Sequence, residues 1–297
     1  MKLGILGDLH GNIAAGRFML WSMGQMGIDT VIHVGDFGIY STNDGMKFAS
    51  RMNEYAKLLD ITIIVVPGNH ENWRIINELT GDNRTKLAMY RSNIFIAPRG
   101  YRYTFDGVSF VMLGGAPSVD RNWRAAADRK RANKGEFQAN QNWYWEEQIT
   151  AADVDYVVAG GYADVMIGHD APHGIQGIES RIKGNPHGFH IADILYAEDG
   201  RKLMTEAFQG VAPRFFFHGH YHFPVNEWIQ RPKGEYGLDK THVIGLDCEF
   251  NNYSMAILDT VEQSAWNVDH KTLLFQYRKD GIGTWPSHAS TKTSMDA

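Results

Sequence analysis

The run at residues 61–66 (Ile-Thr-Ile-Ile-Val-Val) constrains the fold most, because its side chains are β-branched on both faces. Such a strand is typical of a parallel sheet that is covered on both sides. Two similar runs precede it, at residues 3–6 and 30–34, and segments with helical periodicity at 13–27 and 44–59 lie between them. This alternation predicts a βαβαβ unit with right-handed crossovers.

The pattern changes after this unit. Short strands are expected at 93–97, 101–105 and 108–113, and the Asp106-Gly107 turn predicts that the last two pair antiparallel. Further on, the sequence predicts strands at 163–167 and 214–217, a Gly-, Pro- and His-rich loop to about 188, a helix at 199–208, and late strands near 225–229, 242–246, 254–258 and 273–277.

We expect one domain over residues 1–280. Periodicity fails between about 116 and 147, which we interpret as a loop insertion, and residues 281–297 are small and polar, as in a flexible C-terminal tail. The net charge of −5 gives no reason to expect binding to nucleic acid or to an anionic membrane. The single cysteine, Cys248, excludes an internal disulfide and favours a cytoplasmic protein, as does the early Asp8, which excludes a signal peptide.

Residues that can bind metal follow five of the predicted strands. They are Asp8, His10, Asp36, Asn69, His169, His218 and His220. The carboxyl ends of strands in an open α/β sheet share one edge, so side chains far apart in sequence can converge there. Carboxylate, amide and imidazole ligands without a thiolate suit Mn, Fe, Zn or Ni, among which we favour Mn.

The ordered motifs GDLHGN, GDFG, GNHE, GHD and HGHYH resemble the signature of the calcineurin-like metallophosphoesterase superfamily. The resemblance implies a four-layer α/β sandwich with two central mixed β-sheets flanked by helices, and the strands expected from residue 225 onward suit the second sheet. It also implies two divalent metal ions. Asp8, His10 and His220 would bind the first ion, Asn69, His169 and His218 the second, and Asp36 would bridge them.

His70 is the catalytic residue that the resemblance implies, because it would protonate the leaving oxygen. Glu71 either orients His70 or is simply a carboxylate in the first turn of a helix. Arg74 either contacts substrate phosphate or is solvated. The phosphoprotein phosphatases carry GDxxDRG in the second motif, whereas this chain has Gly35-Asp36-Phe37-Gly38, so phosphoprotein phosphatase activity is not expected.

Other histidines have two interpretations. His173 either lines the site or lies outside it, and His222 is either an outer hydrogen-bonding partner of the ligands or an ordinary strand residue. His33 is interpreted as a core residue. Asp170 is a candidate hydrogen-bond acceptor for a ligand.

The segment 120–134 holds six basic and two acidic residues, with Trp123 among them. Arg121 and Arg124 are candidate substrate contacts, because cations bind phosphate and aromatic rings stack on bases. The alternative is a solvated loop held by an aromatic cluster.

These observations favour a binuclear phosphoesterase that cleaves a small phosphodiester or a nucleotide-type phosphoester by attack of a metal-bridging hydroxide. A phosphomonoesterase with the same mechanism and an inactive metal-binding scaffold are the alternatives. The same reaction could cleave a nucleic acid, but we do not favour this substrate because the sequence contains no recognisable nucleic-acid-binding module.

Overall fold

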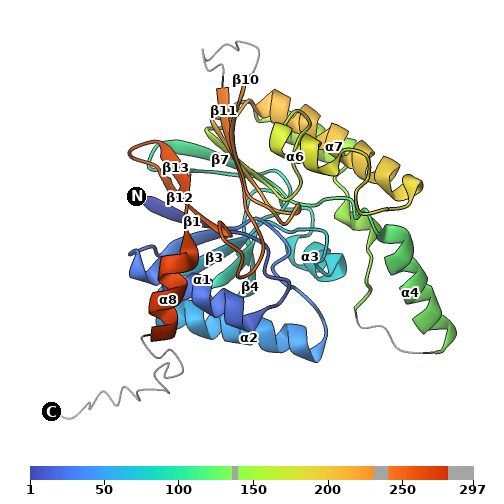
Figure 1. Cartoon of the computed structure of the whole chain (residues 1–297), viewed down its shortest axis with the longest axis horizontal. Helices are drawn as coiled ribbons and strands as arrows, with labels where there is room; N and C mark the ends of the chain where they lie inside the picture. Colours follow the sequence, from blue (N-terminus) through green and yellow to red (C-terminus); the bar gives the residue numbers. More distant parts are fainter. Residues whose placement is uncertain (136–139, 231–239, 280–297) are drawn as a thin grey trace.

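The computed structural model describes residues 1–135, 140–230 and 240–279, and these form two stacked mixed sheets between layers of helices (Figure 1). The first sheet has the order β13 (Ser264–Asn267), β12 (Met255–Asp259), β1 (Lys2–Leu6), β2 (Thr30–His33), β3 (Thr62–Val65), β5 (Ile94–Ile96) and β4 (Ala88–Arg91). The second has the order β10 (Val225–Gln230), β11 (Lys240–Gly245), β9 (Phe215–His218), β8 (Val165–Gly168), β7 (Val108–Leu113) and β6 (Tyr101–Phe105).

The βαβαβ prediction is confirmed. Strands β1, β2, β3 and β5 are neighbours and run parallel, with α1 (Ile13–Gln25) and α2 (Asn43–Leu58) as crossovers. Their outer face packs against α1, α2, α3 (Trp73–Thr80) and α8 (His270–Lys279). The outer face of the second sheet packs against α5 (Ala151–Ala159), α6 (Gln176–Ile182) and α7 (Ile191–Val211). The expected four-layer α/β sandwich is therefore present.

The side chains between the sheets form a core of their own. Ile5, Ile32 and Ile64 of the first sheet belong to the same buried cluster as Phe110 and Ile167 of the second. Because both faces of the sheets are covered, central strands such as β3 and β8 are buried and mainly apolar, whereas the edge strand β10 has exposed polar residues. This packing brings the carboxyl ends of the two parallel strand sets to the same side of the molecule.

Several sequence predictions are wrong in the second half of the chain. Residues 273–277 form part of α8, because Leu273, Leu274 and Tyr277 recur with helical spacing and pack on the first core, while Phe275 points outward. The late strand at 254–258 belongs to the first sheet as β12, since it pairs antiparallel with β1. Local patterns do not encode which sheet a strand joins.

The remaining differences concern helices. The predicted loop insertion at 116–147 contains α4 (Arg121–Asn133) and the short 3-10 helix η1 (Trp145–Glu147). The Gly-, Pro- and His-rich loop contains α6, and the helix expected at 199–208 is the longer α7. The predicted tail at 281–297 lies outside the described residues. Among the described helices, none combines the length and apolarity that crossing a bilayer requires.

The core between the sheets should dominate stability. Phe110 is 1% exposed and stacks on Tyr103 at 4.6 Å between ring centroids. We expect Phe110→Ala to lower the free energy of unfolding by about 3–5 kcal/mol, because it leaves a cavity. Phe275→Ala is the matched control, since Phe275 is 71% exposed, and it should change stability by less than about 0.5 kcal/mol. Equal losses in urea denaturation would contradict this assignment of the core.

Candidate metal centre

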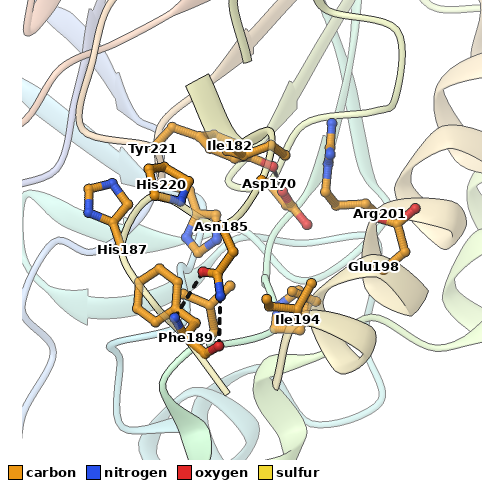
Figure 2. A pocket seen from close by; sticks show the side chains of 15 residues that line it. Asp170, Ile182, Asn185, His187, Phe189, Ile194, Glu198, Arg201, His220 and Tyr221 are labelled. Atoms are coloured by element: carbon orange, nitrogen blue, oxygen red, sulfur yellow. Dashed lines mark hydrogen bonds between the residues drawn. The ribbon is translucent and has the colours of Figure 1, made fainter. Parts of the chain in front are cut away.

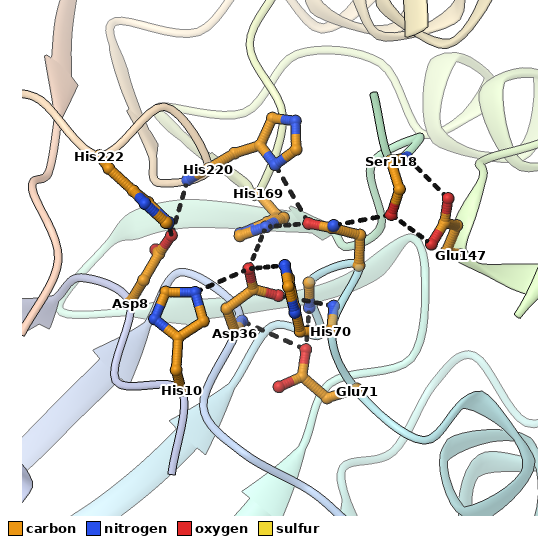
Figure 3. Close-up of polar contacts among 12 residues, drawn as sticks. Asp8, His10, Asp36, His70, Glu71, Ser118, Glu147, His169, His220 and His222 are labelled. Atoms are coloured by element: carbon orange, nitrogen blue, oxygen red, sulfur yellow. Dashed lines mark hydrogen bonds and ion pairs between the residues drawn. The ribbon is translucent and has the colours of Figure 1, made fainter. Parts of the chain in front are cut away.

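The seven predicted ligands and His70 lie at the carboxyl ends of strands from both sheets. Figure 3 shows Asp8, His10, Asp36, His70, His169 and His220 of this group close together. The loops after β1, β2 and β3 contribute from the first sheet, and the ends of β8 and β9 contribute from the second. The residues are Asp8, His10, Asp36, Asn69, His70, His169, His218 and His220. Side chains that are far apart in the sequence thus lie together at one edge of the two sheets, as expected from their places at strand ends.

Asp36 lies at the middle of the group and is 1% exposed. Its Oδ2 is 3.3 Å from Nε2 of His169, 3.5 Å from Nε2 of His10 and 3.9 Å from Nε2 of His70. Its Oδ1 accepts a hydrogen bond from the backbone N–H of His70 at 2.8 Å. One carboxylate thus faces side chains from three other strand ends, the place that the resemblance implies for a bridging ligand.

Asn69 is oriented by a buried chain of hydrogen bonds. Its Oδ1 lies 2.9 Å from Nε2 of His169 and 3.1 Å from Nδ1 of His220. Its Nδ2 donates to Oγ of Ser118 at 2.9 Å, and Ser118 Oγ donates to Oε2 of Glu147 at 2.8 Å. Because Glu147 can only accept when ionised, this chain fixes the amide so that its oxygen faces the histidines. Ser118 and Glu147 carry no local sequence signal that would have revealed this role.

Asp8 brings His222 into the group. Oδ2 of Asp8 accepts from the backbone N–H of His220 at 3.0 Å and lies 3.2 Å from Nε2 of His222. One ligand atom from each of Asp8, His10, Asp36 and His222 lies within 4.8 Å of the others. His222 can therefore act as a ligand itself, a possibility that the two sequence interpretations did not include.

The donor set fits divalent metal ions. Among the described residues, Oδ1 of Asp8 and Nε2 of His218 are buried without a hydrogen-bond partner, and such atoms are costly unless something binds them. The Nδ1 atoms of His169 and His218 bond to the backbone carbonyls of Val34 and Gly219, which leaves each Nε2 for the centre.

The pKa shifts of the residues in this centre also favour a metal ion. Burial disfavours charge on His10 and His169, yet the carboxylate of Asp36 outweighs it and raises the pKa of His10 to about 9 and that of His169 to about 10. The same neighbours hold the pKa of Asp36 well below its usual range despite its burial. The centre therefore attracts positive charge, which a metal ion supplies.

The backbone is unusual at four of these side chains. His10, Asp36, His220 and His222 have φ angles of 45°, 54°, 70° and 52°, in the left-handed region. Non-glycine residues there cost about 1–3 kcal/mol each and cluster at functional sites. Close approach also requires Gly68, because a Cβ there would collide with Asp36.

Glu71 has a role that neither sequence interpretation anticipated. It is fully buried, and its carboxylate accepts hydrogen bonds from the backbone N–H groups of Asp36 (3.2 Å), Gly38 (3.1 Å) and Gly68 (2.5 Å). It precedes α3 rather than lying in its first turn. Glu71 therefore ties the loop after β2 to the loop after β3, and so fixes the spacing of the side chains that they carry.

The candidate substrate residues lie in different places. Arg124 is 9% exposed, and its Nη1 and Nη2 lie 3.1 and 2.5 Å from Nδ1 and Nε2 of His70. Arg121 instead pairs with Asp193 of α7 at 3.1 Å. His173 lies 3.3 Å from Glu198, also on α7. Arg74 is exposed on α3. Of the four, Arg124 is thus the one in direct contact with His70.

The sequence profile of the calcineurin-like phosphoesterase family matches residues 1–224, which include every side chain of the centre described above. The chain belongs to the calcineurin-like phosphoesterase family. It is accordingly a metal-dependent phosphoesterase, and its cluster of two Asp and two His side chains is suited to divalent ions.

Several solved structures are similar to this calcineurin-like phosphoesterase. One crystal structure is 11% identical, covers 90% of this chain and 98% of its own, and has a TM-score of 0.50. A novel archaeal phosphodiesterase is 15% identical, with coverages of 91% and 99% and a TM-score of 0.40. A dimetal phosphatase from Danio rerio is 12% identical, with coverages of 86% and 91% and a TM-score of 0.47. At these identities the first likeness concerns the fold alone. No curated protein sequence matches the chain.

Ser118 should control metal affinity through Asn69. We expect Ser118→Ala to weaken metal binding about 10- to 100-fold, because the Asn69 amide loses the partner that sets its orientation. Ser109→Ala is the control, since Ser109 also bonds a carboxylate, that of Asp164, but on β7 and not through a ligand. Titration calorimetry with Mn would measure both. Equal affinities for Ser118→Ala and the unsubstituted protein would contradict the role of the hydrogen-bond chain.

Proposed function

We propose that this calcineurin-like phosphoesterase binds two divalent ions and hydrolyses a phosphodiester or a nucleotide-type phosphoester. The first ion would be held by Asp8, His10 and His220, with His222 as a further donor, the second by Asn69, His169 and His218, and Asp36 would be shared. The observation that carries the proposal is the position of Asp36, whose Oδ2 faces His10 and His169 at 3.5 and 3.3 Å. Mn is our preferred metal, since the donors are nitrogen and oxygen.

When bound, a pair of such ions lowers the pKa of a water molecule and neutralises phosphoryl charge. His70 then has the task of protonating the leaving oxygen. Burial lowers the pKa of His70 to about 4, and the charge of Arg124 adds to this effect while Asp36 opposes it. The resting ring is therefore neutral. An anionic phosphoester beside the ring would raise its pKa and draw a proton onto it.

Arg124 would position His70, and unlike a carboxylate it can only donate a hydrogen bond to the ring. Nη1 and Nη2 of Arg124 face the two ring nitrogens, and because a neutral imidazole has one acceptor nitrogen, one of these contacts is a hydrogen bond that Arg124 donates. Nε of Arg124 is itself held by Asp120 at 2.6 Å, one turn earlier on the chain. This arrangement supports a role for α4 in catalysis rather than as a solvated loop.

Two separate cavities support a diester substrate, which has two substituents on phosphorus. One cavity of about 310 Å³ is lined by His70, Arg124 and Trp123. Another of about 240 Å³ is lined by His220 and Tyr221. The leaving group belongs on the side of His70, because His70 must reach its oxygen. The second cavity then remains for the other substituent, which a monoester lacks.

The class of substrate can be tested directly. Protein loaded with Mn should hydrolyse bis-p-nitrophenyl phosphate with a higher kcat/KM than p-nitrophenyl phosphate, and chelation should abolish both activities. His70→Ala should lower kcat for the diester about 10²- to 10⁴-fold, the usual contribution of a general acid. A higher kcat/KM for the monoester would favour the phosphomonoesterase alternative. Absence of metal-dependent turnover of either ester would refute the proposed function.

The positioning role of Arg124 predicts a change in pH dependence. Because Arg124 lowers the pKa of His70, Arg124→Ala should move the limb of the kcat–pH profile that reports His70 to higher pH, and it should also lower kcat. Arg121→Ala is the control on the same helix, since Arg121 pairs with Asp193, and it should leave the profile in place. A loss of kcat in Arg124→Ala with no movement of the profile would indicate a purely structural role.

A further inference from the structure

We propose that the cavity between α7 and the loop after α6 binds an apolar ring on the substituent that stays on phosphorus. This inference rests on the proposed function and specifies the substrate class. The cavity has a volume of about 240 Å³. Figure 2 shows its lining side chains around a common space, with His220 and Tyr221 on one side and Ile194, Glu198 and Arg201 of α7 on the other.

The cavity adjoins the metal centre through His220. His220, which lines it, lies 3.1 Å from Oδ1 of Asn69 through its Nδ1. Asp170 and Tyr221, which also line it, directly follow His169 and His220 in the chain. A phosphoryl group bound between the two sets of strand ends would therefore extend one of its substituents along His220 into this space.

The charged groups of the cavity already have partners. Asp170 accepts from the hydroxyl of Tyr221 at 2.7 Å. Arg201, 4% exposed, donates to the carbonyl of Pro172 and to Glu179. Glu198 lies 3.3 Å from His173. With these groups engaged, little remains to bind a second phosphate, and the cavity favours a neutral occupant.

Apart from Asn185, His187 and His220, the rest of the lining is apolar, and it is held in place. Ile182, Phe189, Ile194 and Pro117 contribute side chains. The loop that carries Phe189 is closed by Asn185, which donates to the Phe189 carbonyl at 2.8 Å and accepts from its N–H at 2.9 Å, as Figure 2 shows. Because this loop is already ordered, binding of a ligand would cost less conformational entropy.

The relative positions of the two cavities indicate that the cavity beside His220 holds the substituent that stays on phosphorus. Pro117 and Val119 line it, whereas Asp120, Trp123 and Arg124 line the cavity that includes His70, and none of the residues that the structure describes lines both. The segment from Pro117 to Arg124 therefore separates them. Because His70 protonates the leaving oxygen, the leaving group occupies its side, and the group on the His220 side stays on phosphorus.

The volume limits the occupant to about one ring system. Pockets for drug-sized ligands measure roughly 300–1,000 Å³, so about 240 Å³ is small for a nucleic acid strand or a peptide. The net charge of −5 also disfavours a polyanion. The chemistry described here fits a phenyl, indole or nucleobase-like ring without charge.

The test compares two substrates with the same leaving group. Mn-loaded protein is assayed with p-nitrophenyl phenylphosphonate and p-nitrophenyl methylphosphonate, and each rate is divided by the rate of uncatalysed hydrolysis. We expect a preference for the phenyl compound of about tenfold or more in kcat/KM, because the ring becomes buried. Ala197→Trp fills the cavity and should remove the preference. Leu195→Trp is the control on the same helix, since Leu195 is 58% exposed and outside the lining.

A binding measurement separates this inference from the proposed function. Calorimetry should show phenylphosphonate binding more tightly than methylphosphonate, and Ala197→Trp should equalise them while circular dichroism reports an intact fold. If neither ester is hydrolysed but this binding difference is present, the proposed function fails and the cavity assignment stands. Equal binding of the two phosphonates, or a preference that Ala197→Trp leaves intact, overturns the assignment.

Discussion

The buried carboxylate of Asp36 is the constraint on which the centre depends. A charge that is 1% exposed is unfavourable unless opposite charge and hydrogen bonds compensate it, and here imidazoles and a backbone N–H from other strand ends do so. The two sheets must be stacked with their carboxyl ends aligned for this to occur. Glu71 then sets the distance between the loops after β2 and β3. The stacking of the two sheets and the compensation of the Asp36 charge therefore depend on each other.

The sequence was informative where chemistry and local pattern coincide. The metal-capable residues directly follow apolar runs, so the place of residues such as Asp8, Asp36 and His169 at strand ends could be predicted. The four-layer fold was implied by the resemblance of their motifs to a known superfamily. The parallel unit of the first sheet was equally visible, because a strand buried on both faces, as at 61–66, has a distinctive composition.

Contacts between distant residues were not predictable in this way. Ser118 and Glu147 orient Asn69 across a span that no motif marks, and Arg124 reaches His70 from a helix that reads as an irregular basic segment. The apolar run at 273–277 was ambiguous, since a short run satisfies both strand and helix patterns until its packing partners are known. The pairing of β12 with β1 is likewise a tertiary choice.

The left-handed backbone at His10, Asp36, His220 and His222 has a consequence for how this centre can change over evolution. Apart from glycine, the residue types that tolerate that conformation best are asparagine, aspartate and histidine, and all three can coordinate metals. A substitution by a β-branched or bulky residue meets a backbone penalty before any ligand is considered. The substitutions tolerated at these positions are therefore limited to a few residue types, most of which can still bind metal. In this way the backbone conformation helps to preserve the metal-binding chemistry.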